Sequence, residues 1–500
     1  MRFALLFLVG CAATRPLAVV AVNDVYRIAS PPESPEGGLA RVASLARELS
    51  ATHDVIVTLA GDFVSPALET TFVSKGRHMT EALDAVEGTT EDAVHMVATL
   101  GNHEYDLKPP DFCAAFKGNR FTTVAADSAL FPPCLETPFP RWVSRELGGQ
   151  RVCITGTLGK LTPGMGAPAL EPDALLSSRP EGCDLVLVLT HQDMADDVAL
   201  SRSLRAIPGL PRTVILGGHE HSGLVDVSAE PWVLKAPSDA RRAFVLEFSD
   251  GAVRLSDVVL SGAVPPEAPD VVAVGKAWRD KALAARNIDP AIWSQVLWPA
   301  LPVAIEGEET ALRGRETTLG NLVADALRQL EGAERAAVVN TGSLRLGRDI
   351  PAGADLTVGH LLETDLFEAE IVAVAGVTAA ELLAIGKDSL IGWPGQGRFP
   401  ALSANLTLDA AGIRGAGAAV TLLTTSYMCT NPKGAAENPA LHAVCKARPD
   451  SVRRVGVLRE LVQRCLSTEA CREAVGRDLT TRRIDLRAPS PTSPASAPQP

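Results

Sequence analysis

The chain has 500 residues, which is too long for one compact core and predicts two domains, or at most three. Apolar residues make up 46% and charged residues 21%, a typical globular composition that excludes a mainly disordered or multi-span membrane chain. Aromatic residues make up only 4% and the net charge is −12, which argues against binding of polymeric nucleic acid. Any ligand that carries phosphate therefore needs a local site.

Residues 1–11 have the pattern of an export signal. Arg2 precedes the apolar run 3–9, which is far shorter than the ~20 residues that a membrane helix needs. Leu-Val-Gly-Cys at 8–11 resembles the bacterial lipobox, in which the cysteine is lipidated and becomes the mature N-terminus. We expect an exported protein, in the periplasm or cell envelope, that contacts the membrane only through a lipid on Cys11. An ordinary signal segment, or a misassigned start codon, is the alternative.

The remaining cysteines suit an exported chain. None of them forms a Cys-x-x-Cys pair, so disulfides are favoured over zinc or redox sites. The sequence does not fix their connectivity, and reduced, buried cysteines are the alternative. The simplest pairing joins near neighbours: Cys113 with Cys134, Cys429 with Cys445, and Cys465 with Cys471.

The N-terminal half alternates apolar runs with amphipathic stretches. Residues 39–49 place their apolar side chains on one helical face. Continuous apolar runs predict strands that are buried on both faces, at 17–22, 54–60, 94–100, 184–190 and 213–216. The alternation predicts an α/β domain, and such sheets place their ligands at the carboxyl ends of the strands.

Polar loops follow these predicted strands and carry groups that bind divalent metals. In chain order the loops supply Asp24, Asp62, Asn102, His191, and the pair His219 and His221. Each residue alone is more typical of a turn or of a structural hydrogen bond. Carboxylate, amide and imidazole groups at successive strand ends together indicate a metal site.

These motifs resemble the ordered signature of the calcineurin-like metallophosphoesterases, D-x-H, G-D, G-N-H-[ED], H and G-H-x-H. The extended segment Gly-Asn-His-Glu-Tyr-Asp at 101–106 and Gly-Gly-Leu-Ala-Arg at 37–41 are most similar to the 5′-nucleotidase branch of that family. The resemblance covers most of 17–250. It implies an N-terminal β-sandwich flanked by helices (αββα).

The resemblance also implies two divalent metal ions, which could be Zn, Mn, Co or Fe. Two such cations lower the pKa of a bridging water and clamp the phosphate. His103 would stabilise the transition state or protonate the leaving group, and Asp106 would orient its ring. The implied ligands are Asp62 as the bridge, Asp24 and His221 on the first metal, and Asn102, His191 and His219 on the second.

Tyr26 departs from the family pattern, because it stands where a histidine would complete the first metal site. A neutral phenol is a poor ligand for zinc or manganese near pH 7. Three interpretations follow: water fills the position and the enzyme works, the phenolate binds a ferric ion, or activity is much reduced.

Proline density rises over 262–270, and regular periodicity stops there, which predicts a domain boundary. The second domain, α+β in class, resembles the 5′-nucleotidase C-terminal substrate domain, and 313–326 is similar to its opening R-x-x-E-x-x-L-G-N-L-x-x-D helix. The predicted segments are 1–11 (signal and lipobox), 17–262 (metallophosphoesterase domain), 263–300 (linker with a helix), 301–486 (substrate domain) and 487–500 (disordered Pro/Ser-rich tail).

The second resemblance implies substrate-binding residues. Arg313 opens the helix motif, and Asn340, Gly342 and Arg345 match an N-x-G-x-x-R motif whose arginine helps to hold the substrate. A guanidinium group suits a phosphate or carboxylate. The alternative is that Arg345 pairs with a structural carboxylate.

Aromatic residues that could hold a base are few. Phe399 lies where the family has one of two rings that enclose the nucleobase, although a core phenylalanine is the alternative. The Gly-Gly-Asp-Gly loop that carries the second ring is missing, and Tyr427 is a weak substitute. Nucleotide specificity is therefore less firmly predicted than phosphoester hydrolysis.

We predict an exported, metal-dependent phosphohydrolase, 5′-nucleotidase-like, that releases phosphate from nucleoside 5′-monophosphates or related small phosphoesters. A nucleotide-sugar pyrophosphatase or a 2′,3′-cyclic phosphodiesterase would use the same dimetal site. A surface-bound binding protein with the fold but little turnover is a third possibility. The expected partner is a small-molecule phosphoester, and the oligomeric state stays open.

Overall fold

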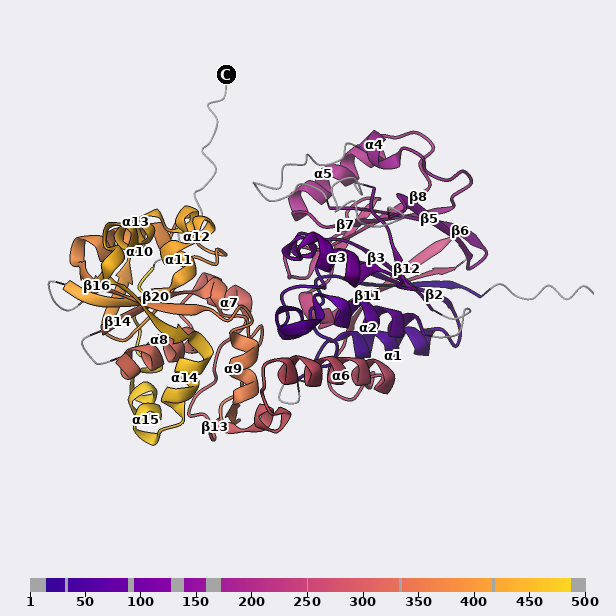
Figure 1. Ribbon diagram of the computed structural model, residues 1–500. Coiled ribbons are helices and arrows are strands. Elements are labelled where there is room, and N and C mark those ends of the chain that lie inside the picture. Colours follow the sequence, from indigo (N-terminus) through magenta and orange to yellow (C-terminus); the bar gives the residue numbers. More distant parts are fainter. Residues whose placement is uncertain are drawn as a thin grey trace, which may run out of the picture. The chain divides into compact units, whose positions relative to one another are not determined.

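The computed structural model describes residues 15–31, 35–88, 94–126, 139–158, 172–249, 251–331, 335–415 and 419–486. The chain divides into two compact units, 1–287 and 288–500, which we describe separately (Figure 1). The predicted signal segment with Cys11 and the predicted C-terminal tail lie outside the described residues. Within the described residues, no helix has both the length and the apolar character needed to cross a membrane.

Two sheets form the centre of the first unit. Their strand orders are β12-β11-β1-β2-β3-β4 and β5-β6-β7-β8-β10-β9. The central pairs β1 with β2, β2 with β3, β6 with β7 and β7 with β8 are parallel. The strands are β1 (Leu17–Val22), β2 (Asp54–Ala60), β3 (Val94–Thr99), β4 (Thr122–Thr123), β5 (Trp142–Leu147), β6 (Gln150–Thr157), β7 (Leu185–Thr190), β8 (Arg212–Gly217), β9 (Leu224–Asp226), β10 (Trp232–Lys235), β11 (Arg242–Ser249) and β12 (Ala252–Val259).

Helices cover both outer faces of the two sheets. Helices α1 and α2 pack on the first sheet and α6 packs on them, whereas α5 packs on β8 and β10 of the second (Figure 1). This arrangement confirms the predicted β-sandwich flanked by helices. The helices are α1 (Leu39–Leu49), α2 (Arg77–Glu87), α3 (Pro109–Phe116), α4 (Pro172–Leu176), α5 (Met194–Arg205) and α6 (Pro269–Ala285).

Strand β1 shows why the central strands read as continuous apolar runs. Leu17, Val19 and Ala21 belong to the core between the two sheets. The alternate residues face the layer of α1 and α2, where Val20 and Val22 pack. Because side chains alternate between the faces of a strand, a strand that is buried on both faces needs apolar residues at every position.

The second unit is built on a mixed sheet of order β17-β14-β20-β16-β21. Helix α8 packs on β14 and β17, while α10 and α11 pack on β16, and Figure 1 shows these helices on opposite sides of the sheet. The predicted α+β class is therefore confirmed. Its strands are β13 (Val296–Trp298), β14 (Arg335–Asn340), β15 (Leu356–Thr357), β16 (Glu370–Thr378), β17 (Pro400–Leu402), β18 (Leu406–Asp409), β19 (Gly412–Gly415), β20 (Ala419–Thr425) and β21 (Val452–Val457).

The helices of the second unit follow the same pattern of one buried face. In α14, for example, Leu458, Leu461, Val462 and Cys465 are buried. The helices are α7 (Glu309–Gly314), α8 (Thr318–Glu331), α9 (Val358–Thr364), α10 (Ala379–Ser389), α11 (Ser426–Thr430), α12 (Pro432–Glu437), α13 (Pro439–Ala447), α14 (Leu458–Leu466) and α15 (Glu469–Asp478).

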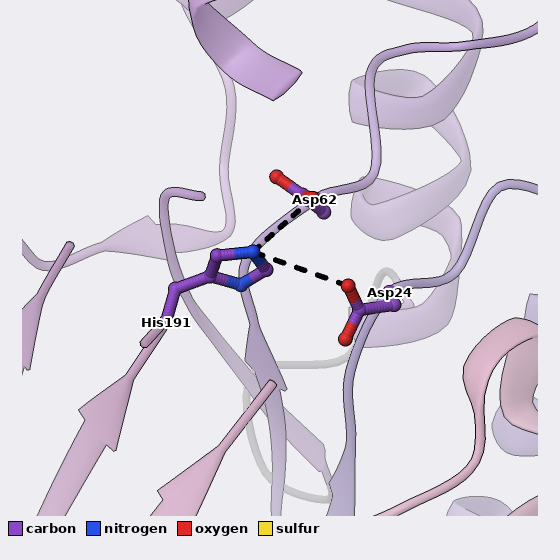
Figure 2. Close-up of side chains that lie close together, drawn as sticks. All are labelled: Asp24, Asp62 and His191. Carbon is purple, nitrogen blue, oxygen red and sulfur yellow. Dashed lines mark ion pairs between the residues drawn. The ribbon is translucent and has the colours of Figure 1, made fainter. Parts of the chain in front are cut away.

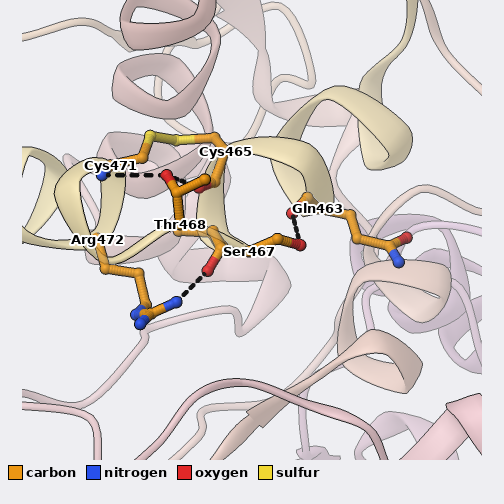
Figure 3. The surroundings of a disulfide bond; sticks show 7 residues. Gln463, Cys465, Ser467, Thr468, Cys471 and Arg472 are labelled. Atoms are coloured by element: carbon orange, nitrogen blue, oxygen red, sulfur yellow. Dashed lines mark hydrogen bonds between the residues drawn. A yellow bond between two sulfur atoms is a disulfide. The ribbon is translucent and has the colours of Figure 1, made fainter.

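Disulfides connect several of these elements. Two predicted pairs, Cys429 with Cys445 and Cys465 with Cys471, are confirmed. Figure 3 shows the second pair at the junction of α14 and α15, where the Thr468 side chain accepts a hydrogen bond from the backbone of Cys471. The third described disulfide joins Cys153 to Cys183, the two cysteines that the near-neighbour pairing left unassigned. Cys113 is also disulfide-bonded, and its predicted partner, Cys134, lies outside the described residues.

Candidate metal centre

The predicted ligands meet at one edge of the first unit because they follow strands whose carboxyl ends lie together. Asp24, Asp62 and Asn102 follow the adjacent parallel strands β1, β2 and β3. His191 and His219 follow β7 and β8 of the other sheet, and both of these strands contact β2 across the sandwich. The two sheets therefore contribute ligands from both sides.

The Asp24 carboxylate has one oxygen held by the chain and one directed at the cluster. Its Oδ2 accepts hydrogen bonds from Asn23 Nδ2 at 2.7 Å and from the backbone N–H of His219 at 2.9 Å. Its Oδ1 lies 3.3 Å from His221 Nε2 and 4.0 Å from His191 Nε2. The carboxylate is fully buried, so bulk water does not reach its second oxygen.

Asp62 and His191 are held in the same way. Asp62 Oδ1 accepts the backbone N–H of His103 at 2.8 Å, and Asp62 Oδ2 lies 3.1 Å from His191 Nε2. The Nδ1 of His191 donates to the carbonyl oxygen of Ala60 at 2.8 Å. This bond turns Nε2 towards Asp24 and Asp62 (Figure 2), and it is the outer contact that a metal-binding histidine typically makes.

These three side chains fit a divalent cation. One ligand atom from each of Asp24, Asp62 and His191 lies within 4.8 Å of the others. Asp24 Oδ1 and His191 Nε2 are buried and make no hydrogen bond of good geometry within the described part of the chain. Buried polar atoms without partners are costly. A cation at this point would satisfy them both.

The electrostatics of the cluster favour a bound positive charge. Burial alone lowers the pKa of His191, but the charges of Asp62 and Asp24 outweigh it and raise the pKa to about 10. Burial raises the pKa of Asp62, and the opposing effect of His191 and His103 leaves it well below its usual value. The two carboxylates therefore attract a cation, which a proton on His191 or a metal ion can supply.

The other predicted ligands lie beside this cluster. His219 Nδ1 lies 3.1 Å from Asn102 Oδ1, and the rings of His219 and His191 are 5.3 Å apart. His221 contacts Asp24 as described above. The structure thus brings every predicted metal ligand of the first unit to one place.

Tyr26 also reaches the cluster. Its hydroxyl group lies 3.1 Å from His221 Nε2 and donates to Asp62 Oδ2 at 3.4 Å. The phenol therefore occupies the side of the cluster where Asp62 and His221 meet. A histidine at this position would lack the hydroxyl group that makes these hydrogen bonds.

His103 and Asp106 form the predicted pair. His103 Nδ1 and Asp106 Oδ2 lie 2.7 Å apart, and Ser65 Oγ donates to the same carboxylate oxygen at 2.9 Å. Both residues belong to one short 3₁₀ turn over 103–106, directly after Asn102. Asp106 can therefore fix the orientation of the ring next to the predicted metal ligands.

The backbone at the ligands is strained. Asp24, Asp62, His219 and His221 have φ values of 52°, 56°, 92° and 60°, in the left-handed region that non-glycine residues seldom adopt. The glycine before Asn102 is required by close approach, because a Cβ on Gly101 would lie 2.2 Å from Asp62 Oδ1. Such strain is typical of functional sites, where the surroundings fix the conformation.

Sequence reasoning did not assign a role to Glu104, which organises the loop after β2. The side chain is fully buried and accepts the backbone N–H groups of Asp62, Phe63, Val64 and Gly101. Burial, followed by the charge of Asp62, raises its pKa. The position of Glu104 within the motif at 101–106 was the sequence signal for such a role.

Lys235 is a second buried residue that the sequence did not single out. It is 1% exposed at the end of β10 and contacts both Asp197 and Glu220. A lysine in an otherwise apolar strand was the signal for it.

In the second unit the predicted arginines converge on one carboxylate. Arg345 Nη1 donates to Glu309 Oε1 at 2.7 Å, and Arg313 forms an ion pair with the same oxygen. The Arg345 guanidinium also lies over the ring of Phe367, which is 46% exposed. Arg345 thus has a carboxylate partner within its own unit.

The motif after β14 is closely packed. Asn340 Oδ1 accepts hydrogen bonds from Thr425 Oγ1 at 2.8 Å and from Ser343 Oγ at 3.0 Å. The backbone N–H of Gly342 donates to the carbonyl oxygen of Gly397 at 2.7 Å. Asn340 therefore helps to fold the loop that presents Arg345.

The candidate aromatic residues have different surroundings. Phe399 is 1% exposed and stacks on Trp393, with ring centroids 6.4 Å apart and planes at 22°. Trp393 is only partly buried and its Nε1 donates to the carbonyl oxygen of Gly314 at 2.8 Å. Tyr427 donates its hydroxyl hydrogen to Glu437 at 2.7 Å. Phe399 and Trp393 thus form one aromatic pair, and Tyr427 makes a separate contact.

Comparison with family models identifies the class of the protein. The model for the calcineurin-like phosphoesterases matches residues 17–223, so the first unit is a metallophosphoesterase and the protein is a hydrolase that acts on ester bonds. The model for the 5′-nucleotidase C-terminal domain matches residues 300–425. With both domains in this order, the chain belongs to the 5′-nucleotidase-like family of metallophosphoesterases. No curated protein matches the sequence.

Solved structures share the fold over almost the whole chain. A 5′-nucleotidase precursor from Thermus thermophilus has a TM-score of 0.65 and 21% identity, covering 94% of this chain and 99% of that one. The sulfate thiohydrolase SoxB of Thermus thermophilus, in complex with glycerol, has a TM-score of 0.60 and 14% identity, covering 95% and 96%. A third structure, from Staphylococcus aureus and in complex with α-ketoglutarate, has a TM-score of 0.55 and 13% identity, covering 94% and 99%. At these identities the likeness extends to the fold alone.

Proposed function

We propose that this protein is an exported phosphohydrolase with two metal ions, which releases phosphate from nucleoside 5′-monophosphates or related small phosphoesters. The observation that carries the proposal is the cluster of Asp24, Asp62 and His191. Their ligand atoms lie close together, and Asp24 Oδ1 and His191 Nε2 are buried without hydrogen-bond partners in the described residues. Family membership supports an ester substrate.

In this proposal Asp62 bridges the two metal ions, with Asp24 and His221 on the first. The neighbouring group of Asn102, His191 and His219 holds the second. When bound, two divalent ions would lower the pKa of a water and neutralise the charge of the phosphate. The metal could be Zn, Mn, Co or Fe.

His103 is the proposed proton donor to the leaving group. Asp106 contacts Nδ1 at 2.7 Å, so Nε2 on the opposite side of the ring is the atom we assign to this transfer. Ser65 in turn holds Asp106 in place by donating a hydrogen bond to its carboxylate. Asp106 therefore orients the ring of His103 so that Nε2 can donate a proton to the leaving oxygen.

For Tyr26 we propose that a water, and not the phenol, completes the first metal site. The hydroxyl group already makes hydrogen bonds to His221 and Asp62, which suits a group that orients the ligands. Reduced activity and a ferric phenolate site are the alternatives. A charge-transfer colour of the purified protein would identify the ferric form.

In the second unit we propose Arg313 and Arg345 as the groups that hold the anionic part of the substrate, with Asn340 and Gly342 shaping their loop. We keep Phe399 as a candidate for base binding. Because Phe399 is buried and Trp393 is partly exposed, Trp393 is the ring of the stacked pair that a base would reach. Tyr427 is the weaker candidate.

Export is the remaining part of the proposal. The described disulfides support it, because such bonds persist in oxidising compartments. We propose a lipid anchor at Cys11. Metabolic labelling with a palmitate analogue should mark the wild-type protein and should be lost in Cys11→Ala; equal labelling of the variant would contradict the anchor.

The test of the function is hydrolysis of a substrate panel by metal-loaded protein. AMP, a nucleotide sugar, a 2′,3′-cyclic nucleotide and an aryl phosphate are each assayed with Mn, Zn, Co or Fe, beside Asn102→Ala. We expect metal-dependent release of phosphate, most rapid with AMP, and loss of it in the variant.

The other outcomes separate the alternatives. Preference for the nucleotide sugar or the cyclic nucleotide would identify the pyrophosphatase or the cyclic phosphodiesterase. Protein that binds metal but hydrolyses none of the panel would favour a binding protein. Turnover that survives both metal removal and Asn102→Ala would contradict the assigned site.

A further inference from the structure

The side chain of Lys235 is buried next to the loops that carry the proposed metal ligands, and its ammonium group makes several polar contacts. Lys235 Nζ lies 2.9 Å from Asp197 Oδ2 and donates to Glu220 Oε2 at 2.6 Å. It also donates to the carbonyl oxygens of Gly218, at 2.9 Å, and Gln192. A buried ammonium group is costly unless it is paired and hydrogen-bonded, and this one is both.

The contacts of Lys235 flank the proposed ligands on two different loops. The residue directly after His191 supplies one carbonyl group, and the residue directly before His219 supplies the other. Glu220 lies between His219 and His221 in the chain. One ammonium group therefore connects the loop after β7 to the loop after β8.

The two carboxylates that contact Lys235 strengthen this connection. Asp197 Oδ1 accepts a hydrogen bond from Gln192 Nε2 at 2.8 Å, and Glu220 Oε1 accepts one from the backbone N–H of Met194. Each carboxylate thus contacts Lys235 with one oxygen; with the other, Asp197 binds Gln192 in the loop after β7 and Glu220 binds Met194 at the start of α5. The network leaves little freedom for either loop.

The strained histidines need such support. His219 and His221 have φ values of 92° and 60°, and this conformation persists only when its surroundings fix it. Lys235 holds the chain on both sides of His219, through Gly218 and Glu220. At the preceding position, a Cβ on Gly217 would lie 2.8 Å from Lys235 Cε, so the glycine provides room for the lysine side chain.

We propose that Lys235 is a positioning residue of the metal centre, which holds His191 and His219 in the geometry that binds metal. This inference rests on the metal site of the proposed function. The contacts of Lys235 are to loop carbonyl groups and to carboxylates outside the ligand set, so its removal changes metal affinity before it changes substrate binding.

The test is the affinity for Mn²⁺, measured by equilibrium dialysis of the full chain without substrate. In Lys235→Met we expect the dissociation constant of at least one bound ion to rise about 10- to 100-fold, the range typical of lost outer contacts. Lys276→Met is the matched control, because Lys276 pairs with Asp280 on the exposed side of α6. The control should bind Mn²⁺ as the wild type does.

Kinetics give a second readout that a general loss of stability would not produce. At limiting Mn²⁺ the variant should lose kcat, and at saturating Mn²⁺ kcat should recover with KM unchanged. Circular dichroism and thermal unfolding establish that each variant is folded. A folded Lys235→Met with wild-type affinity for Mn²⁺ would overturn the proposal.

If Lys235→Met does not fold, Glu220→Gln decides the question, because it keeps the shape of the side chain and removes one ion pair. We expect it to weaken Mn²⁺ binding about 10-fold, the lower part of the same range; wild-type affinity would overturn the proposal. Wild-type protein that binds Mn²⁺ but hydrolyses no ester would contradict the proposed function alone. Wild-type protein that binds none of Mn²⁺, Zn²⁺, Co²⁺ and Fe²⁺ in the same dialysis would contradict both.

Discussion

At the scale of single residues, the site depends on side chains that bind the surrounding chain with one polar atom and the cluster with another. Asp24, Asp62 and His191 each give one polar atom to a backbone or amide partner and direct the other at their common centre. The fixed atoms limit rotation of each ligand before any ion binds. Preorganisation of this kind lowers the entropy lost on binding.

His103→Ala should separate proton transfer from metal binding. We expect kcat to fall by about 10²- to 10⁴-fold, the usual contribution of a general acid, while metal content stays at the wild-type level. Steady-state kinetics and elemental analysis measure the two quantities. His53→Ala, which removes a histidine paired with Glu247 away from the cluster, is the control. An unchanged kcat in His103→Ala would exclude this residue as the acid.

His78 predicts a loss of stability in mild acid. Burial lowers its pKa from 6.5 to about 3. Between these values the unfolded chain binds a proton that the folded chain excludes, so the free energy of unfolding decreases as the pH falls below about 6.5. His78→Gln, which can still contact Ser74, lacks this titration.

Urea unfolding of the first unit at pH 7 and pH 5 measures the effect. We expect the wild type to lose about 2 kcal/mol more than the variant over this range, since one pKa unit corresponds to about 1.4 kcal/mol. Parallel losses in the two proteins would show that His78 is not the group responsible.

At the scale of elements, short loops and turns determine which groups can reach a ligand. Helix α7 and the loop after β14 bring Arg313 and Arg345 to one carboxylate, Glu309. Two guanidinium groups that share one acidic partner still carry a net positive charge. An incoming phosphate would compete with Glu309 for both of them.

Glu309→Gln should therefore strengthen substrate binding if the arginines hold an anion. Removal of a partly exposed ion pair worth about 1 kcal/mol predicts that KM falls roughly fivefold with kcat little changed. Kinetics with AMP measure both values, and Glu370→Gln, at a surface ion pair with Arg454, is the control. An unchanged or higher KM would assign the Arg313 and Arg345 pair a purely structural role.

At the scale of the whole molecule, the described disulfides close loops of very different length. Cys153 and Cys183 are 30 residues apart in the sequence, whereas Cys465 and Cys471 are 6 apart. Because loop-closure entropy grows with length, replacing the first pair by serine should cost about 3 to 4 kcal/mol and the second about 2 kcal/mol. Chemical unfolding of the two double variants measures the order, and an equal loss would contradict the entropic account.

Much of the fold and of the cluster was predictable because both depend on local pattern. Continuous apolar runs predict the buried parallel strands, and the strand ends identify the residues that meet. The pairing of Cys153 with Cys183 was left open in the sequence because it depends on the parallel pairing of β6 with β7, where Cys153 lies opposite Val186. The contacts of Lys235 were missed for the same reason, since its partners come from two distant loops. Metal binding by the cluster stays a prediction.

The left-handed backbone at four of the ligand positions has an evolutionary consequence. Asp, Asn and His tolerate this conformation better than most residues, so Asp24, Asp62, His219 and His221 are constrained by folding in addition to the proposed ligation. A descendant that had lost its metals would tend to keep them. Asn102, with an ordinary φ of −76°, and His191 are not among the left-handed positions, so we expect substitutions at these two positions to come first in related sequences that lose metal binding.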